Sequence, residues 1–67
     1  MSDHIAIIKR KVKVWDGEEP TEITVIQKSK TAWRASGEYM GERIEATGRT
    51  ANSAAGTWRT MAHRKGN

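Results

Sequence analysis

The chain has 67 residues, with 12 lysines and arginines, 8 acidic residues, two histidines and no cysteine, so its net charge is +4. A domain of this size buries only about 60% of its unfolded surface, and without cysteine it has no disulfide and no usual set of ligands for structural zinc. No segment is long and apolar enough to predict a signal peptide or a membrane span. We therefore expect one cytoplasmic domain over residues 1–67, without cofactor, metal or membrane contact.

The distribution of residue types predicts the fold class. Leucine and phenylalanine are absent, and isoleucine, valine and threonine, which favour strands, are concentrated before residue 48. Alanine dominates the segment that follows. This predicts an α+β fold in which a three- or four-stranded antiparallel β-meander, within residues 5–47, carries one C-terminal helix over 50–65 on one face. Residues 1–4 are expected to be a flexible N-terminus.

The first predicted strand covers residues 5–15, IAIIKRKVKVW. Its second half alternates, which places Val12 and Val14 on one face of a strand. A helix would also fit the apolar spacing, but the many β-branched residues favour a strand. The alternation changes at Ile7 and Ile8, which indicates a bulge or burial on both faces. The lysines on the opposite face are Lys9, Lys11 and Lys13.

The rest of the first 48 residues reads as turns between short strands. Asp-Gly and Pro20 predict a loop, and pairs of glycines or polar runs predict the later turns. Trp33 and Ala35 are expected on one face of their strand, and Ile44 and Ala46 point inward from theirs. The predicted order is loop 16–21, strand 22–28, tight turn 28–30, strand 31–36, turn 37–41 and strand 43–47.

The last third of the chain predicts a helix. Its apolar residues recur at the spacing that forms one helix face, and its polar residues fall opposite them. Thr50 is the expected N-cap, with Asn52 or Ser53 as alternatives, and Gly66 suits the position after the helix. The expected buried face is Ala51, Ala54, Ala55, Trp58, Met61 and Ala62, and the expected polar face is Asn52, Gly56, Arg59 and His63.

Cationic side chains supply the candidate binding residues. Residues 1–48 are electrically balanced, so the excess positive charge belongs to residues 49–67, where an anionic partner would be attracted most strongly. Alternate lysines on a strand lie about 6.6 Å apart, close to the spacing of phosphates. Ordinary solvated faces and edge protection would explain the same pattern. The candidate contacts for nucleic acid are Lys9, Lys11, Lys13, Trp15, Lys28, Lys30, Arg34, Arg49 and Arg59.

Aromatic residues among these cations suggest a second mode of binding. Trp15, Trp33 and Tyr39 could stack on unpaired bases if they were exposed on the sheet. In a chain without leucine or phenylalanine, however, Trp33 and Trp58 are needed to fill the core. The position of Trp15, at the edge of a turn, is compatible with either role.

One pattern in the chain is loosely similar to small DNA-binding domains. Trp33, Ala35 and Gly37, followed by Gly48, Thr50, Ala54, Ala55 and Trp58, resemble domains of three strands and a helix. Examples are the ethylene-response-factor type of plants and the arm-binding domains of phage integrases. The resemblance implies DNA binding through the sheet face opposite the helix, with Lys9, Lys11, Lys13, Lys28, Lys30 and Arg34 as the contacting residues.

These observations favour binding over catalysis. The serines and the two histidines have no recognisable catalytic context, and no glycine pattern matches a phosphate-binding loop. We expect no enzymatic activity and no small-molecule substrate. The leading expectation is an accessory protein that binds DNA or RNA through a basic sheet face. The alternative is a module that forms a homodimer or binds another protein and has no affinity for nucleic acid.

Overall fold

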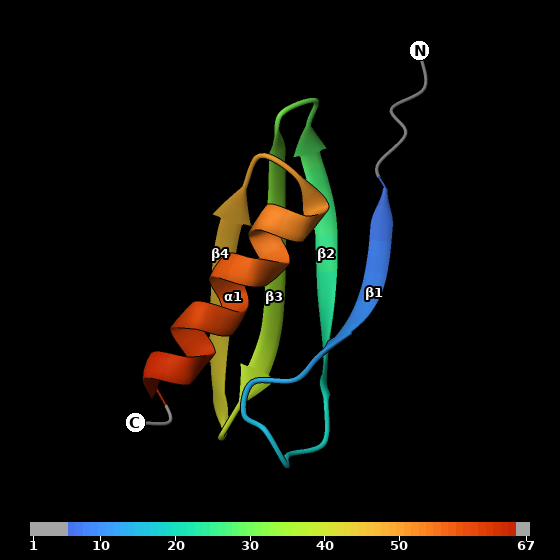
Figure 1. Ribbon diagram of the computed structural model, residues 1–67. Coiled ribbons are helices and arrows are strands. Elements are labelled where there is room, and N and C mark those ends of the chain that lie inside the picture. Colours follow the sequence, from blue (N-terminus) through green and yellow to red (C-terminus); the bar gives the residue numbers. More distant parts are fainter. Residues whose placement is uncertain (1–5, 66–67) are drawn as a thin grey trace.

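The computed structural model describes residues 6–65, which form a four-stranded sheet and one helix (Figure 1). The strands follow one another in the sheet in chain order and each pair is antiparallel, which confirms the predicted meander. The elements are β1 (Ile7–Val12), β2 (Thr21–Ser29), β3 (Ala32–Tyr39), β4 (Glu42–Gly48) and α1 (Ala51–Lys65). The expectations for residues 1–5 and for Gly66 lie outside the described residues.

The register of the strands divides the sheet into two faces. Paired residues of an antiparallel sheet point to the same side, and Val25 pairs with Ile8 on β1 and with Ala35 on β3. Helix α1 packs across β4 and β3 and part of β2, while β1 lies at the far edge (Figure 1). The buried residues of the helix-covered face are Ile23, Val25, Ala35, Tyr39, Ile44 and Ala46. The other face of the sheet is covered by no element of residues 6–65.

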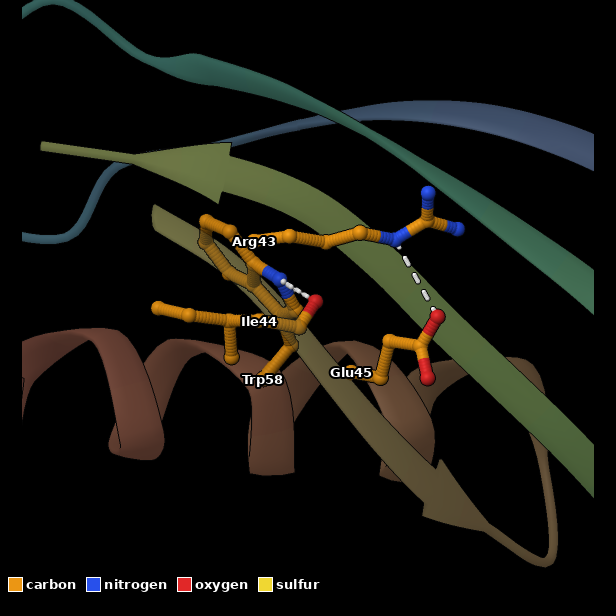
Figure 2. A network of polar contacts seen from close by, with 4 residues as sticks. All are labelled: Arg43, Ile44, Glu45 and Trp58. Atoms are coloured by element: carbon orange, nitrogen blue, oxygen red, sulfur yellow. Dashed lines mark hydrogen bonds and ion pairs between the residues drawn. The ribbon is translucent and has the colours of Figure 1, made fainter. Parts of the chain in front are cut away.

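Trp58 is the centre of the core. It is fully buried, and its indole Nε1–H donates a hydrogen bond of 2.9 Å to the main-chain carbonyl of Ile44 (Figure 2). Tyr39 meets its ring edge-on at 6.4 Å between centroids. A buried tryptophan is stable in this arrangement, because its ring is removed from water while its N–H keeps a hydrogen-bond partner. This single large side chain fills the space that small alanines leave between helix and sheet.

The helix begins as predicted. The Ser53 N–H donates to Thr50 Oγ1 at 3.0 Å, so Thr50 is the N-cap. Ala54, Ala55, Trp58 and Ala62 are buried, but Met61 is 41% exposed, so its assignment to the buried face was wrong. Met61 lies at the border of the apolar face, where it lines a groove together with Met40 and Glu42 of the β3–β4 turn. The alanines instead bring the helix backbone close to the sheet.

The polar face of α1 makes two contacts that the periodicity did not predict. Arg59 Nε donates a hydrogen bond of 2.8 Å to the carbonyl of Lys13, and the ring of His63 stacks on Trp15 with centroids 3.6 Å apart. These contacts attach the loop between β1 and β2 to the helix. Arg59 is exposed, as the periodicity predicts, and His63 is half-buried; both also connect the helix to the loop.

Strand β1 is shorter than predicted, because it ends at Val12. Residues 13–20 form a loop in which Val14 is only 1% exposed and closes the core, while Gly17 has the positive φ expected after Asp16. The predicted alternation through Trp15 therefore stops at Val12. A loop that turns across the end of the sheet can bury Val14 without continuing the strand.

The turn predicted over residues 37–41 is confined to Met40 and Gly41, since β3 continues to Tyr39. Both turn residues have positive φ, 54° and 81°, as in a type I′ hairpin. Gly37 lies inside β3 for a different reason. A Cβ there would come within 2.7 Å of Ile23 Cγ2 and 3.2 Å of Trp58 Cζ2, so the glycine makes room for the tryptophan ring.

Candidate nucleic-acid interface

The sheet face opposite α1, which we call the open face, carries two of the three lysines predicted for it. Lys9 and Lys11 alternate with residues of the helix-covered side, and both are exposed. Arg34 lies on the same face, because it pairs with Ile26 and Thr47 while its neighbour Ala35 is fully buried beneath the helix. Lys13 follows the end of β1 and belongs to the loop.

Acidic residues interrupt the open face. Arg43 projects from β4 beside Glu45, and its Nε lies 3.1 Å from a carboxylate oxygen of Glu45 (Figure 2). Glu38 pairs with Arg43 across the strands, and Glu22 pairs with Lys11. The open face is thus a mixed polar surface, whereas the sequence predicted a basic one. Ile7, at 63% exposure, is its most exposed apolar residue among those described.

Charge is instead separated along the strands. One end of the sheet, the hairpin end, contains the β2–β3 turn, the start of β1, the end of β4 and the start of α1 (Figure 1). Its exposed cations are Lys28, Lys30, Arg34 and Arg49. Among residues 6–65 no acidic residue lies beyond the row of Lys9, Thr24, Ser36 and Glu45 toward this end. The hairpin end is therefore a local cationic surface.

The opposite end of the sheet, the loop end, collects most of the described acids. It contains the 13–20 loop, the β3–β4 turn and the C-terminus of α1 (Figure 1). Cations of α1 are balanced there, as in the ion pair between Lys65 and Glu42. The acidic residues of this end are Asp16, Glu18, Glu19, Glu22, Glu38 and Glu42. These six acids are offset by the six cations Lys11, Lys13, Arg43, Arg59, Arg64 and Lys65, so an anion approaching the molecule would be attracted more strongly to the hairpin end.

None of the aromatic residues lies on the open face. Trp33 pairs with Gln27 and Gly48, which places it on the helix-covered side, where it packs against the core. Trp15 is half-buried in the loop against His63, and Tyr39 and Trp58 are in the core. The open face therefore has no aromatic ring on which bases could stack, in contrast to what Trp15, Trp33 and Tyr39 suggested. The groups that this face offers to an anion are the side chains of lysine and arginine.

The loop end is held together by a polar contact whose strength depends on pH. The Tyr39 hydroxyl donates to the Glu18 carboxylate, 3.2 Å from each of its oxygens. Burial raises the pKa of Tyr39, and the hydrogen bond to Glu18 and its negative charge raise it further, while Trp15 acts in the opposite direction. This contact fixes the acidic loop and lies away from the cationic hairpin end.

Two features of this interface were missed by sequence reasoning. Arg43 could have been placed on the open face from its position next to the inward-facing Ile44. The separation of charge between the two ends depends on strand register and on the direction of each turn, so the linear order of charges did not reveal it. Arg49 is far from Lys28 and Lys30 in sequence, but the end of β4 and the β2–β3 turn both lie at the hairpin end of the sheet.

Residues 6–65 contain no group of three histidine or acidic side chains arranged to hold a metal ion. Within the same residues, no helix has the length and apolar character needed to cross a membrane. A shallow open-face hollow of about 300 Å³ is lined by Thr24, Ser36, Gly37, Glu38 and Arg43. A wider groove of about 610 Å³ at the loop end is lined by Met40, Glu42, Met61, Arg64 and Lys65.

Comparison of the chain with models of protein families, with curated proteins and with solved structures gives no match. The likeness to small DNA-binding domains therefore rests on the residue pattern alone.

Proposed function

We propose that this protein binds nucleic acid through phosphate contacts made at the hairpin end and on the adjoining open face of the sheet. The contacting residues would be Lys28, Lys30, Arg34 and Arg49, with Lys9 in the neighbouring row. The observation that carries the proposal is that the hairpin end holds cations and, among residues 6–65, no acids. Five exposed cations gather at or beside one end of the sheet, and the acids of residues 6–65 lie in the row of Lys9 or nearer the other end.

The surface chemistry supports binding to the backbone in preference to bases. Lysine and arginine on a polar, exposed surface provide point charges and hydrogen-bond donors for phosphate oxygens. The helix-covered side holds every aromatic residue of the chain, so the open face lacks the platform on which single strands usually stack. We therefore expect duplex nucleic acid to bind at least as well as a single strand of the same sequence.

The proposed contacts leave out part of the predicted set. Arg59 is engaged with the Lys13 carbonyl on the helix side of the molecule, and Trp15 is stacked on His63. Lys11 faces Glu22 across the strands, which offsets its charge. The interface is accordingly narrower than the sequence suggested, and it is displaced toward the β2–β3 turn.

The test is the salt dependence of binding, measured by fluorescence anisotropy with a labelled mixed-sequence duplex. Each neutralised phosphate contributes about −0.9 to the slope of log K against log salt, so four or five contacts predict a slope of about −4. The double variant Lys30→Gln/Arg34→Gln should reduce the magnitude of that slope by about 2 and weaken binding at every salt concentration.

The matched control is Lys13→Gln/Arg64→Gln. It removes the same net charge from exposed residues of the loop end and should leave the slope nearly unchanged. Equal losses in the two double variants would contradict the proposed location, because they would show attraction by net charge alone. Absence of binding at low salt would contradict nucleic-acid binding itself, and a strong preference for single strands would contradict the backbone mode.

A further inference from the structure

The outer edge of β1 is a second surface with its own chemistry. β1 is the first strand of the sheet, and no strand of residues 6–65 pairs with its outer side. The Gln27 N–H donates to the Ala6 carbonyl at 2.9 Å, so Ala6 belongs to a hydrogen-bonded pair with β2. Such pairs alternate along antiparallel strands. The main-chain groups of Ile8, Arg10 and Val12 therefore point toward β2, and those of Ile7, Lys9 and Lys11 point outward.

The other edge of the sheet is managed differently. Helix α1 packs more extensively over β4 than over any other strand (Figure 1). The outer edge of β1 has no comparable cover, because helix α1 packs over β4, β3 and part of β2 (Figure 1). A row of outward N–H and C=O groups without cover is a template for adding a strand.

The side chains of β1 combine two properties along six residues. Ile7 and Ile8 are 63% and 37% exposed, on opposite faces of the strand, although both are large apolar residues. Lys9, Arg10 and Lys11 then give three consecutive cations, and β1 contains no acid. The edge is therefore apolar at its start and strongly positive at its centre.

These charges disfavour a second copy of the chain as the occupant. Each antiparallel register that pairs five or six residues of two β1 strands sets cations among Lys9, Arg10 and Lys11 directly opposite one another. Like charges in directly opposed cross-strand positions are destabilising. The complementary occupant has carboxylates at the positions where this strand has lysines.

We propose that the outer edge of β1 binds an extended acidic segment of another protein, which joins the sheet as a fifth, antiparallel strand. The segment would carry carboxylates opposite Lys9 and Lys11 and β-branched apolar residues opposite Ile7, Ile8 and Val12. Main-chain hydrogen bonds to Ile7, Lys9 and Lys11 supply affinity, and the alternating side chains supply register and specificity. This proposal does not rest on nucleic-acid binding, and the two partners would compete for Lys9.

The probe is a synthetic peptide that contains Val-Glu-Thr-Glu-Val-Ile, written to run antiparallel to β1 from Val12 to Ile7. The control peptide replaces both glutamates by lysine. Binding of each to the full chain is measured by NMR titration, together with amide hydrogen exchange. With two opposed charge pairs reversed, we expect the control peptide to bind at least about tenfold more weakly.

Hydrogen exchange provides the signature that a nonspecific charge contact would lack. The amides of Ile7, Lys9 and Lys11 should gain protection on peptide binding. The amides of Ile8, Arg10 and Val12, already bonded to β2, should change little. A peptide that binds without this alternation, or that protects β3 or β4 instead, would overturn the proposal, as would equal binding of the control peptide or no binding of either.

A charge exchange tests the pairing directly. Lys9 pairs with Thr24 on β2, so Lys9→Glu places no acid against an acid within the sheet. This variant should bind the acidic peptide more weakly and the lysine peptide more tightly than the original chain does. An unchanged preference would contradict the pairing. A homodimer detected by sedimentation, in which the amides of Ile7, Lys9 and Lys11 gain protection without any peptide, would show that a second copy is the occupant and would overturn the proposal.

Discussion

Replacing Gly37 by alanine tests the packing argument at the centre of the fold. A Cβ at this position would lie 2.7 Å from Ile23 Cγ2, 3.2 Å from Ile23 Cβ and 3.2 Å from Trp58 Cζ2. Both neighbours are almost completely buried, with exposures of 1% and 0%. A branched side chain and a hydrogen-bonded indole have little freedom to move aside. The added methyl group should therefore force a shift in the core.

The size of the effect follows from two opposing contributions. Overpacking of a core lowers the free energy of unfolding by about 1–3 kcal/mol. Replacing glycine by alanine also makes the unfolded chain less flexible, which raises the free energy of unfolding by about 0.4–1 kcal/mol. The free energy of unfolding of Gly37→Ala should consequently fall by about 1–2 kcal/mol. For a domain of this size that corresponds to a Tm lower by roughly 5–15 °C. Circular dichroism during thermal and urea denaturation measures both quantities.

Gly56→Ala is the matched control, because a Cβ at Gly56 meets no atom within 4 Å outside the helix itself. Alanine in place of glycine within a helix is worth about 1 kcal/mol, so this variant should be more stable than the original chain. The two identical substitutions are thus expected to change stability in opposite directions. A neutral or stabilising Gly37→Ala would refute the close packing of β3 against Trp58.

Three further predictions concern local structure. Met40→Asn should raise stability by roughly 0.5–1 kcal/mol in urea denaturation, because the positive φ of 54° suits asparagine in a type I′ turn; lower stability would contradict that turn. Thr50→Ala should cost about 1 kcal/mol in the same assay through the lost N-cap, whereas Thr50→Ser should not. The pKa of Tyr39, the chain's only tyrosine, is raised on folding. The contribution of its protonated hydroxyl to stability is therefore fully present below pH ~10 and is lost as the pH rises through the pKa of the folded state. Absorbance titration should show Glu18→Gln lowering this pKa, and no change would contradict the contact.

Much of the fold could be predicted because local patterns agreed with the final packing. The spacing of Ala54, Ala55, Trp58 and Ala62 describes a helix face that is indeed buried, and Thr50 is its N-cap. Errors arose where a residue had two physical uses. Gly37 was interpreted as part of a turn, but its lack of a side chain serves packing against Trp58, a contact between segments far apart in sequence.

The candidate interface was less predictable, since it depends on how strands align. Alternation correctly placed Lys9 and Lys11 on the open face. It also placed Arg34 there, on the face opposite to that of the buried Ala35. It could not show that Glu45 and Lys9 share a row across the sheet, or that Arg49 reaches the end that holds the β2–β3 turn. The side on which Trp15 lies was also undetermined, because a loop has no periodicity to follow.

The most direct measurement of the proposed function is an NMR titration of the isotopically labelled protein with mixed-sequence duplex, at low and then at physiological salt. Phosphate binding at the hairpin end predicts amide shifts in residues 28–34 and 47–49 and near Lys9 that weaken steeply as salt rises. Shifts confined to the C-terminus of α1 or to the 13–20 loop, or no shifts even at low salt, would contradict it.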